Sequence, residues 1–217
     1  MTVLPHIPQR LHAIGQAGVI AVLRAPSSEA AVAAAEAVIA GGVTAIEVTY
    51  STPSPAAAIA RIAQEFPEAI VGAGTLTREP QVNEAAAAGA AFLVSPGTSP
   101  SIVTAMVDTG LPTMSGAVTP TEVMSAMELG VNAVKIFPGS LVGPSYLRAL
   151  RGPFPDVPLM PTGGVSVDNL ADWLAAGAFA VGAGSELCSA ADMEDQNWQL
   201  ITDKATRFSE ALAAARS

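Results

Sequence analysis

The sequence predicts a single (β/α)8 barrel (a TIM barrel) with an N-terminal capping helix, and three observations lead to this prediction. An alanine-rich helix, followed by glycine and a short apolar strand, recurs along the chain. Eight such strands can be placed, and the helices between them imply right-handed crossovers and a parallel sheet. Eight units fit the 217 residues as a small barrel. A doubly wound open sheet is the alternative.

The predicted strands and helices alternate in order. Each strand is short and apolar and ends at Gly, Pro, Ser or Thr, and the eight lie near 19–24, 45–49, 70–73, 92–95, 113–115, 133–137, 159–161 and 178–182. The helices between them are expected near 28–40, 55–66, 80–89, 99–109, 120–129, 144–150 and 167–176. Glycine after several of these helices supplies a left-handed cap. A helix near 5–16 is expected to plug the bottom of the barrel, and one near 195–214 to close the outer ring.

Composition narrows the class of protein. The formal net charge of −9 and the pI near 4.6 disfavour nucleic acid as a partner, because nucleic acid is itself a polyanion. No run of about 18 apolar residues occurs, so no membrane span is expected. The first residues lack a signal-peptide layout, and the single cysteine, Cys188, fits the reducing cytoplasm. We therefore expect one cytoplasmic domain over residues 1–217, with Cys188, Trp173 and Trp198 as packing residues.

Three of the predicted strands carry one charged residue each, and the other five carry none. These residues are Arg24, Glu47 and Lys135. Alternation along the strands places all three on the inward face, near the C-terminal strand ends where barrel enzymes have their active sites. Charge inside a parallel barrel is costly, because both faces of every strand are covered. A purely structural ion network is the alternative, but such networks rarely stabilise a core better than apolar packing does.

Lys135 is a candidate nucleophile. Burial in an apolar barrel disfavours the ammonium form and makes a neutral amine available to attack a carbonyl. The only other lysine, Lys204, falls in the predicted C-terminal helix and is expected on the surface. His6 and His12 both precede the first strand, which disfavours a histidine-bound metal and a Ser-His-Asp triad. We predict Lys135 and Glu47 as catalytic residues, with Glu47 as the general acid and base and no metal.

Two glycine-bearing loops predict an anion site. Thr162-Gly163-Gly164-Val165 follows the seventh strand and Gly182-Ala183-Gly184-Ser185 the eighth. Phosphate-binding barrels use these two loops, because glycine lets backbone N–H groups approach an oxyanion. Ser185 is expected to add a hydroxyl and to open a short helix. Simple turns are the alternative. Gly72-Ala73-Gly74-Thr75 lacks the third glycine of a dinucleotide fingerprint, so no nicotinamide site is expected.

Several short motifs between about Gly18 and Leu187 together resemble one family. They are Val22-Leu23-Arg24, Gly41-Gly42-Val43, Glu47-Val48-Thr49, Val71-Gly72-Ala73-Gly74-Thr75, Ser95-Pro96-Gly97, Gly116 with Thr119-Pro120-Thr121-Glu122, Lys135-Ile136-Phe137-Pro138 and Pro161-Thr162-Gly163-Gly164. In this combination the chain resembles the 2-dehydro-3-deoxy-phosphogluconate (KDPG) aldolases, class I aldolases that often also act on 4-hydroxy-2-oxoglutarate (KHG). The resemblance implies a cofactor-free enzyme for a 2-keto acid sugar phosphate, assembled as a homotrimer.

The resemblance also implies roles for individual residues. Lys135, in the Lys-x-Phe-Pro run, would form the Schiff base, and Glu47, in the Glu-Val-Thr run, would shuttle protons. The positions implied to contact substrate are Thr75 and Thr162 with Pro96 and Phe137 at the keto acid, and Gly163, Gly164 and Ser185, next to Gly184, at the phosphate.

One departure from the family pattern affects carboxylate binding. Many members have an arginine two residues after the threonine of Glu-Val-Thr, where this chain has Ser51. Other members carry an arginine in the first strand instead, as Arg24 does, so the substrate carboxylate is assigned to Arg24.

Cleavage of KDPG to pyruvate and glyceraldehyde 3-phosphate is the expected reaction. Relatives specific for the galactonate epimer tend to have valine at Thr162, so this threonine favours the gluconate compound. The alternatives are an aldolase acting mainly on KHG or on the galactonate epimer, and a non-catalytic barrel that binds a sugar phosphate.

Overall fold

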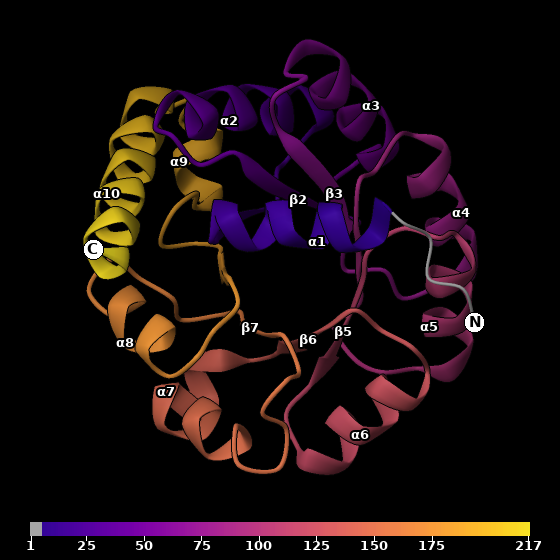
Figure 1. Ribbon diagram of the computed structural model, residues 1–217. Helices are drawn as coiled ribbons and strands as arrows, with labels where there is room; N and C mark the ends of the chain where they lie inside the picture. Colours follow the sequence, from indigo (N-terminus) through magenta and orange to yellow (C-terminus); the bar gives the residue numbers. More distant parts are fainter. Residues whose placement is uncertain (1–5) are drawn as a thin grey trace.

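The computed structural model describes residues 6–217, in which eight short parallel strands alternate with helices. The strands are β1(Val19–Leu23), β2(Ala45–Thr49), β3(Ile70–Gly74), β4(Leu93–Val94), β5(Thr113–Ala117), β6(Ala133–Ile136), β7(Leu159–Pro161) and β8(Val181–Ala183). They form one sheet in the order β7-β6-β5-β4-β3-β2-β1-β8. Figure 1 shows the helices as a ring around these strands. The predicted (β/α)8 barrel is confirmed.

Helices cover the outer face of the strands, except the first helix, which lies across one end of the barrel (Figure 1). The helices are α1(His6–Ala17), α2(Ser28–Ala40), α3(Pro55–Glu65), α4(Glu79–Ala87), α5(Pro100–Asp108), α6(Pro120–Glu128), α7(Gly139–Leu150), α8(Leu170–Ala175), α9(Ala190–Glu194) and α10(Trp198–Arg216). α10 packs against α2 and α8 and so closes the ring, as the sequence predicts. None of the helices within residues 6–217 has the length and the apolar run that crossing a bilayer requires.

The helix starts are encoded locally, which explains why the sequence located them well. At α6, the Thr119 side chain accepts from the Glu122 backbone N–H, and the Glu122 carboxylate accepts from the backbone N–H groups of Val118 and Thr119. Those backbone donors lower the pKa of Glu122. Pro120 occupies the first turn, where its missing N–H is not needed.

The bottom of the barrel is filled by an apolar layer beneath α1. Ile14 of α1 packs on inward-facing residues near the N-terminal ends of the strands, all of them buried: Ile20, Ala45, Phe92, Val94, Met114, Ala133 and Met160. Figure 1 looks onto this end and shows α1 lying across it. The predicted plug is therefore confirmed from residue 6 onward, while residue 5 of that prediction lies outside the described residues. This close-packed apolar layer forms the floor of the barrel.

The barrel closes between β7 and β8 by fewer contacts than elsewhere. The sheet ends at these two strands, and a single parallel bridge between Thr162 and Gly182 joins them. The backbone N–H of Phe179 donates to the carbonyl of Leu159 at 2.9 Å at the bottom of the same seam. The seam therefore carries Thr162 at its upper end, beside the two glycine loops.

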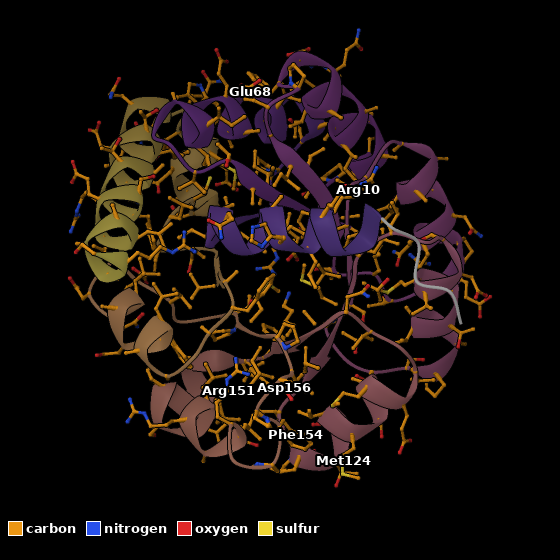
Figure 2. All side chains as sticks on the ribbon, in the orientation of Figure 1. Arg10, Glu68, Met124, Arg151, Phe154 and Asp156 are labelled. Atoms are coloured by element: carbon orange, nitrogen blue, oxygen red, sulfur yellow. The ribbon has the colours of Figure 1, made fainter. Side chains whose placement is uncertain are left out.

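Arg151, at the end of α7, ties the bottom loops together. Its guanidinium donates to the carbonyls of Val157 at 2.7 Å and Pro155 at 3.1 Å, and also to the carbonyl of Gly177. Figure 2 shows Arg151, Phe154 and Asp156 close together beside α7. This end of the barrel is held by structural contacts.

Several predicted boundaries are wrong, each for a local reason. α7 starts at Gly139, earlier than the predicted residue 144, because two helical pieces join across a kink at Gly143 (φ 73°) and Pro144. α9 was not predicted, since five residues are too few for a periodic pattern. Ser185 begins a turn, with the Leu187 and Cys188 N–H groups bound to the Gly184 carbonyl, so the helix expected there is absent.

Candidate active site

Lys135 and Glu47 meet in the middle of the barrel. Lys135 is on β6 and Glu47 on β2, which are four strands apart in the sheet and so face each other across the interior. The Lys135 Nζ lies 3.4 Å from the Glu47 Oε1. Lys135 is 4% exposed and Glu47 is 0% exposed. The two residues form a buried ion pair directly above the apolar floor.

Two buried oxygen atoms, one on Glu47 and one on Thr162, remain available for hydrogen bonds. Among residues 6–217, the Glu47 Oε2 and the Thr162 Oγ1 have no hydrogen-bond partner, although both are buried. Buried polar atoms in folded proteins are nearly always satisfied, so an exception needs a reason. Both atoms are therefore available to hydrogen-bond a bound substrate.

The backbone makes room for the Glu47 carboxylate at Gly74. Gly74 pairs with Thr49 in the β2–β3 ladder, and Thr49 lies two residues after Glu47 on β2. A Cβ on Gly74 would overlap the Glu47 carboxylate. The next residue, Thr75, has φ 58°, a left-handed conformation that a β-branched side chain rarely adopts. Such strain costs about 1–3 kcal/mol and collects at functional sites. The half-buried Thr75 is thus held at the end of β3 in a conformation that its own sequence disfavours.

An aromatic ring covers the lysine from above. Phe137 follows β6, and the Lys135 Nζ lies 5.3 Å from the centroid of its ring. A cation at this distance from an aromatic face is attracted to it. The Phe137 side chain remains 37% exposed, which is unusual for a large aromatic residue. It lines the mouth through which a substrate would reach the amine.

One cavity of about 240 Å³ gathers most of the predicted substrate-binding residues. Its lining includes Arg24, Phe137, Thr162, Gly163, Gly164, Gly184 and Ser185. Gly163 and Gly164 both have positive φ, at 93° and 72°, so the turn that they form excludes ordinary side chains. Asn169 fixes this turn, because its Nδ2 donates to the Gly164 carbonyl at 2.8 Å and its Oδ1 accepts from the Ser166 N–H at 3.0 Å.

The structure places Arg24 differently from the prediction. β1 ends at Leu23, so Arg24 lies just beyond the strand and is exposed. The sequence argument selected Arg24 because burying a charge is costly. Since Arg24 is exposed, that argument does not hold for this residue. Arg24 still lines the cavity, together with Val22 of β1.

Four predicted site residues do not line this cavity: the catalytic Lys135 and Glu47, and the substrate-binding Thr75 and Pro96. Pro96 lines a separate hollow of about 340 Å³ with Leu76 and Ile102. The backbone of Pro96 nevertheless packs on Gly116, which pairs with Lys135 in the β5–β6 ladder. Pro96 is therefore close to the lysine strand without sharing the cavity.

Five cavity residues were not predicted as part of the site: Val22, Val165, Glu186, Cys188 and Ala190. Glu186 follows Ser185 directly, so its place in the loop after the eighth strand could have suggested it. Cys188 is buried in the core, as predicted, and burial raises the pKa of its thiol to about 12. A thiol held in this form is a poor nucleophile at neutral pH.

Lys204 was expected on the surface of the C-terminal helix, and this expectation is only partly right. It lies on α10, but its Nζ is 2.6 Å from the Asp192 Oδ2, and this bond is the main reason that the pKa of Asp192 is lowered. Within the part of the chain that the structure describes, no group of three or more His, Cys, Asp or Glu side chains could hold a metal ion.

A buried lysine paired with a glutamate inside a (β/α)8 barrel is the arrangement expected of a Schiff-base lyase on this fold. The sequence model described as "Aldolase: KDPG and KHG aldolase" matches residues 11–204. The chain belongs to this family of aldolases, which are carbon–carbon lyases.

Known relatives agree with this assignment. The chain is 39% identical over 198 residues to the 2-dehydro-3-deoxy-phosphogluconate aldolase of Dickeya dadantii (strain 3937), covering 91% of this chain and 92% of that one. It is 33% identical over 195 residues to the 2-dehydro-3-deoxy-6-phosphogalactonate aldolase of Escherichia coli (strain K12), covering 89% and 95%.

Solved structures are also similar. The KDPG aldolase of Legionella pneumophila, with pyruvate captured as a covalent carbinolamine intermediate, superposes with a TM-score of 0.83 at 33% identity and covers 90% of this chain and 96% of that one. A cube-shaped cage designed by fusing symmetric oligomeric domains gives a TM-score of 0.86 at 33% identity, covering 92% of this chain and 73% of that one.

Proposed function

We propose that this chain is a class I aldolase that cleaves KDPG to pyruvate and glyceraldehyde 3-phosphate through a Schiff base on Lys135. The 3.4 Å contact between the Lys135 Nζ and the Glu47 Oε1 carries this proposal, because it places an amine and a proton shuttle side by side, both buried inside the barrel. The 39% identity to the Dickeya dadantii KDPG aldolase supports the substrate.

The proposed reaction uses only these two side chains for chemistry. The Lys135 amine attacks the C2 carbonyl, and Glu47 relays protons as the carbinolamine loses water to give an iminium. Glu47 then takes the proton of the C4 hydroxyl, the C3–C4 bond breaks, and its electrons pass to the iminium as an enamine. The C4 oxygen becomes the aldehyde of glyceraldehyde 3-phosphate. The enamine is protonated at C3 and hydrolysed, which releases pyruvate and the free lysine. No cofactor is required.

Substrate binding is assigned along the cavity. Arg24 binds the carboxylate, since a planar guanidinium matches a carboxylate in a two-pronged contact. Thr75 and Thr162 bind the keto acid, and Pro96 and Phe137 pack around it. The phosphate is assigned to the two glycine loops, through Gly163, Gly164, Gly184 and Ser185. The side chains of Arg24 and Ser185 line the same cavity as the glycines, which supports a ligand that is anionic at both ends.

Borohydride trapping tests the chemistry. Incubation with pyruvate and borohydride should place a reduced adduct on Lys135, located by peptide mass spectrometry. Lys204→Arg is a matched control, because Lys204 is the only other lysine and the change keeps its charge. Lys135→Met should abolish both labelling and cleavage. Labelling elsewhere, or cleavage that survives Lys135→Met, would discard this mechanism in favour of a non-catalytic sugar-phosphate-binding barrel.

The substrate has two close alternatives, KHG and the galactonate epimer of KDPG. The relative from Escherichia coli K12 that is named for the phosphogalactonate compound makes the epimer a specific candidate. Measuring kcat/KM for KDPG, its epimer and KHG with the same preparation ranks the three. The highest value for KDPG is expected, and a higher value for either other substrate would replace it.

We also infer the wider organisation of the protein. Residues 1–217 are proposed to act as one catalytic domain in a cytoplasmic homotrimer that interacts with neither nucleic acid nor membrane. The similar domain in the designed cage, built from symmetric oligomeric domains, supports an oligomer. The exposed Met124 and Met127 on α6 provide apolar surface for one. Sedimentation equilibrium should give three times the 21.8 kDa chain mass; a single chain mass would refute the trimer.

A further inference from the structure

The loop that carries Arg24 is attached to the end of β2 by two side-chain hydrogen bonds, one on each side of Arg24. The Thr49 Oγ1 donates to the carbonyl of Leu23 at 3.0 Å. The backbone N–H of Ala25 donates to the Thr52 Oγ1 at 3.1 Å. Both threonines are buried, at 0% and 2% exposure. The residues immediately before and after Arg24 are therefore both held, while Arg24 itself extends into the cavity.

These bonds act where the strand ladder ends. The register of β1 with β2 runs as far as Leu23 opposite Val48, and Arg24 lies one residue beyond it. Thr49 and Thr52 continue the attachment past this point through side chains. A long arginine side chain on an unattached loop would lose more conformational freedom on binding an anion than one on a fixed backbone.

The hydrogen bonds within this group determine which hydroxyl is the donor between Thr49 and Ser51. A threonine hydroxyl has one proton, and that of Thr49 is directed to the Leu23 carbonyl. The contact of 2.8 Å between the Thr49 Oγ1 and the Ser51 Oγ must therefore have Ser51 as the donor. The backbone N–H of Thr52 donates to the Thr49 carbonyl at 2.9 Å and closes the turn. The three hydroxyl residues form one hydrogen-bonded unit.

We propose that Thr49 and Thr52, supported by Ser51, are positioning residues that hold the backbone of Arg24 so that its guanidinium meets the anionic group of the substrate. This inference rests on the proposed function, in which Arg24 binds the substrate carboxylate. The unit acts on binding, because it contacts the backbone around Arg24. Thr49 ends β2, and Ser51 and Thr52 lie in the turn after it, whereas Lys135 is on β6. A merely structural role would change stability without any dependence on Arg24.

A double-mutant cycle separates these two roles. Thr52→Val keeps the shape of the side chain but removes the acceptor for the Ala25 N–H, and should raise KM for KDPG on the order of five- to tenfold, with kcat changed less than twofold. Thr52→Ser retains the acceptor and should restore KM to near the wild-type value. Arg24→Met should raise KM further. Adding Thr52→Val to Arg24→Met should then have no additional effect on KM.

Three results would overturn the proposal. An unchanged KM in folded Thr52→Val would do so, and so would a KM effect that persists in full when Arg24 is already Met. An unchanged KM in Arg24→Met would overturn the assignment of Arg24 itself, which distinguishes failure of the proposed function from failure of the positioning unit. If Thr52→Val does not fold, Ser51→Ala, at an exposed position, carries the same criterion with a smaller expected KM increase of about twofold.

The same variants also identify the anionic group. Pyruvate has a carboxylate but no phosphate, so the pyruvate concentration that half-saturates borohydride labelling of Lys135 reports carboxylate binding alone. This concentration should rise in both Arg24→Met and Thr52→Val. An unchanged value in Arg24→Met, with KM for KDPG raised, would move Arg24 to the phosphate and overturn the carboxylate assignment.

Discussion

The lower and upper halves of this barrel are built from the same strands, yet their interiors differ in chemistry. Glu47 lies two positions after Ala45 on β2, and Lys135 lies two positions after Ala133 on β6. Thr162, just past the end of β7, likewise lies two positions after Met160. In each case the lower residue belongs to the apolar floor and the upper one is a buried polar group. The floor stabilises the fold, whereas the upper layer holds charge that apolar packing would replace more favourably. The polar groups proposed to act in catalysis therefore lie in the layer where apolar packing would be more stable.

Making the upper half resemble the lower half should produce the largest effect. Lys135→Met combined with Glu47→Leu should abolish cleavage and raise the free energy of unfolding by about 1–4 kcal/mol, because a buried ion pair is replaced by apolar volume. Urea denaturation monitored by circular dichroism measures the change.

The exposed pair Arg61–Glu65 provides the control for this substitution. Its side chains are about half exposed and its atoms lie 3.0 Å apart. Arg61→Met with Glu65→Leu should change stability by less than about 1 kcal/mol. A double variant of Lys135 and Glu47 that is less stable than the wild type would show that the upper layer also supports the fold.

A single methyl group should disturb the upper half without changing any charge. The added Cβ of Gly74→Ala would overlap the Glu47 carboxylate and displace it from Lys135. A misplacement of this kind lowers kcat about 100-fold. Gly97→Ala is the matched control, because a Cβ there meets nothing within 4 Å. Steady-state kinetics on both variants checks the prediction, and equal kcat values for the two would contradict it.

Substitutions in the two layers should have opposite consequences. Ile20→Val, in the floor, should lower the free energy of unfolding by about 0.5–1.5 kcal/mol and leave kcat/KM within twofold of wild type. Thr162→Val, in the upper layer, should leave stability unchanged and lower kcat/KM for KDPG relative to its galactonate epimer. Thermal unfolding and kinetics on the same preparations compare them. Loss of stability in Thr162→Val with unchanged kinetics would reverse the roles of the layers.

The smallest effect is expected at the rim of the cavity. Glu186 lines the cavity beside Ser185, where the phosphate is assigned. Glu186→Gln removes a negative charge from an exposed position, and should lower KM for KDPG about two- to threefold at low salt. The difference should shrink as ionic strength rises, because exposed charges are screened. A KM that does not depend on salt in either protein would exclude this electrostatic effect.

The sequence predicted the fold and the two central residues because both depend on local patterns. Helix starts such as Thr119-Pro120 are fixed by capping, and the alternation along β2 and β6 fixes which side chains point inward. Arg24 was predicted inside a strand and lies just beyond it, since a strand end depends on where its neighbour stops pairing. The short helix α9 and the turn at Ser185 were missed because too few residues carry a pattern there.

By itself, the sequence determined the number of βα units, the helix that plugs the bottom of the barrel and the inward direction of Glu47 and Lys135. These follow from a two-residue period and from local helix signals, which are written along the chain. Only the tertiary structure decided that two residues 88 positions apart meet at 3.4 Å. It also decided that Thr49 and Thr52 hold the loop of Arg24, and that Pro96 lies outside the cavity. Such contacts depend on strand register and loop path across the closed barrel, which no local pattern contains.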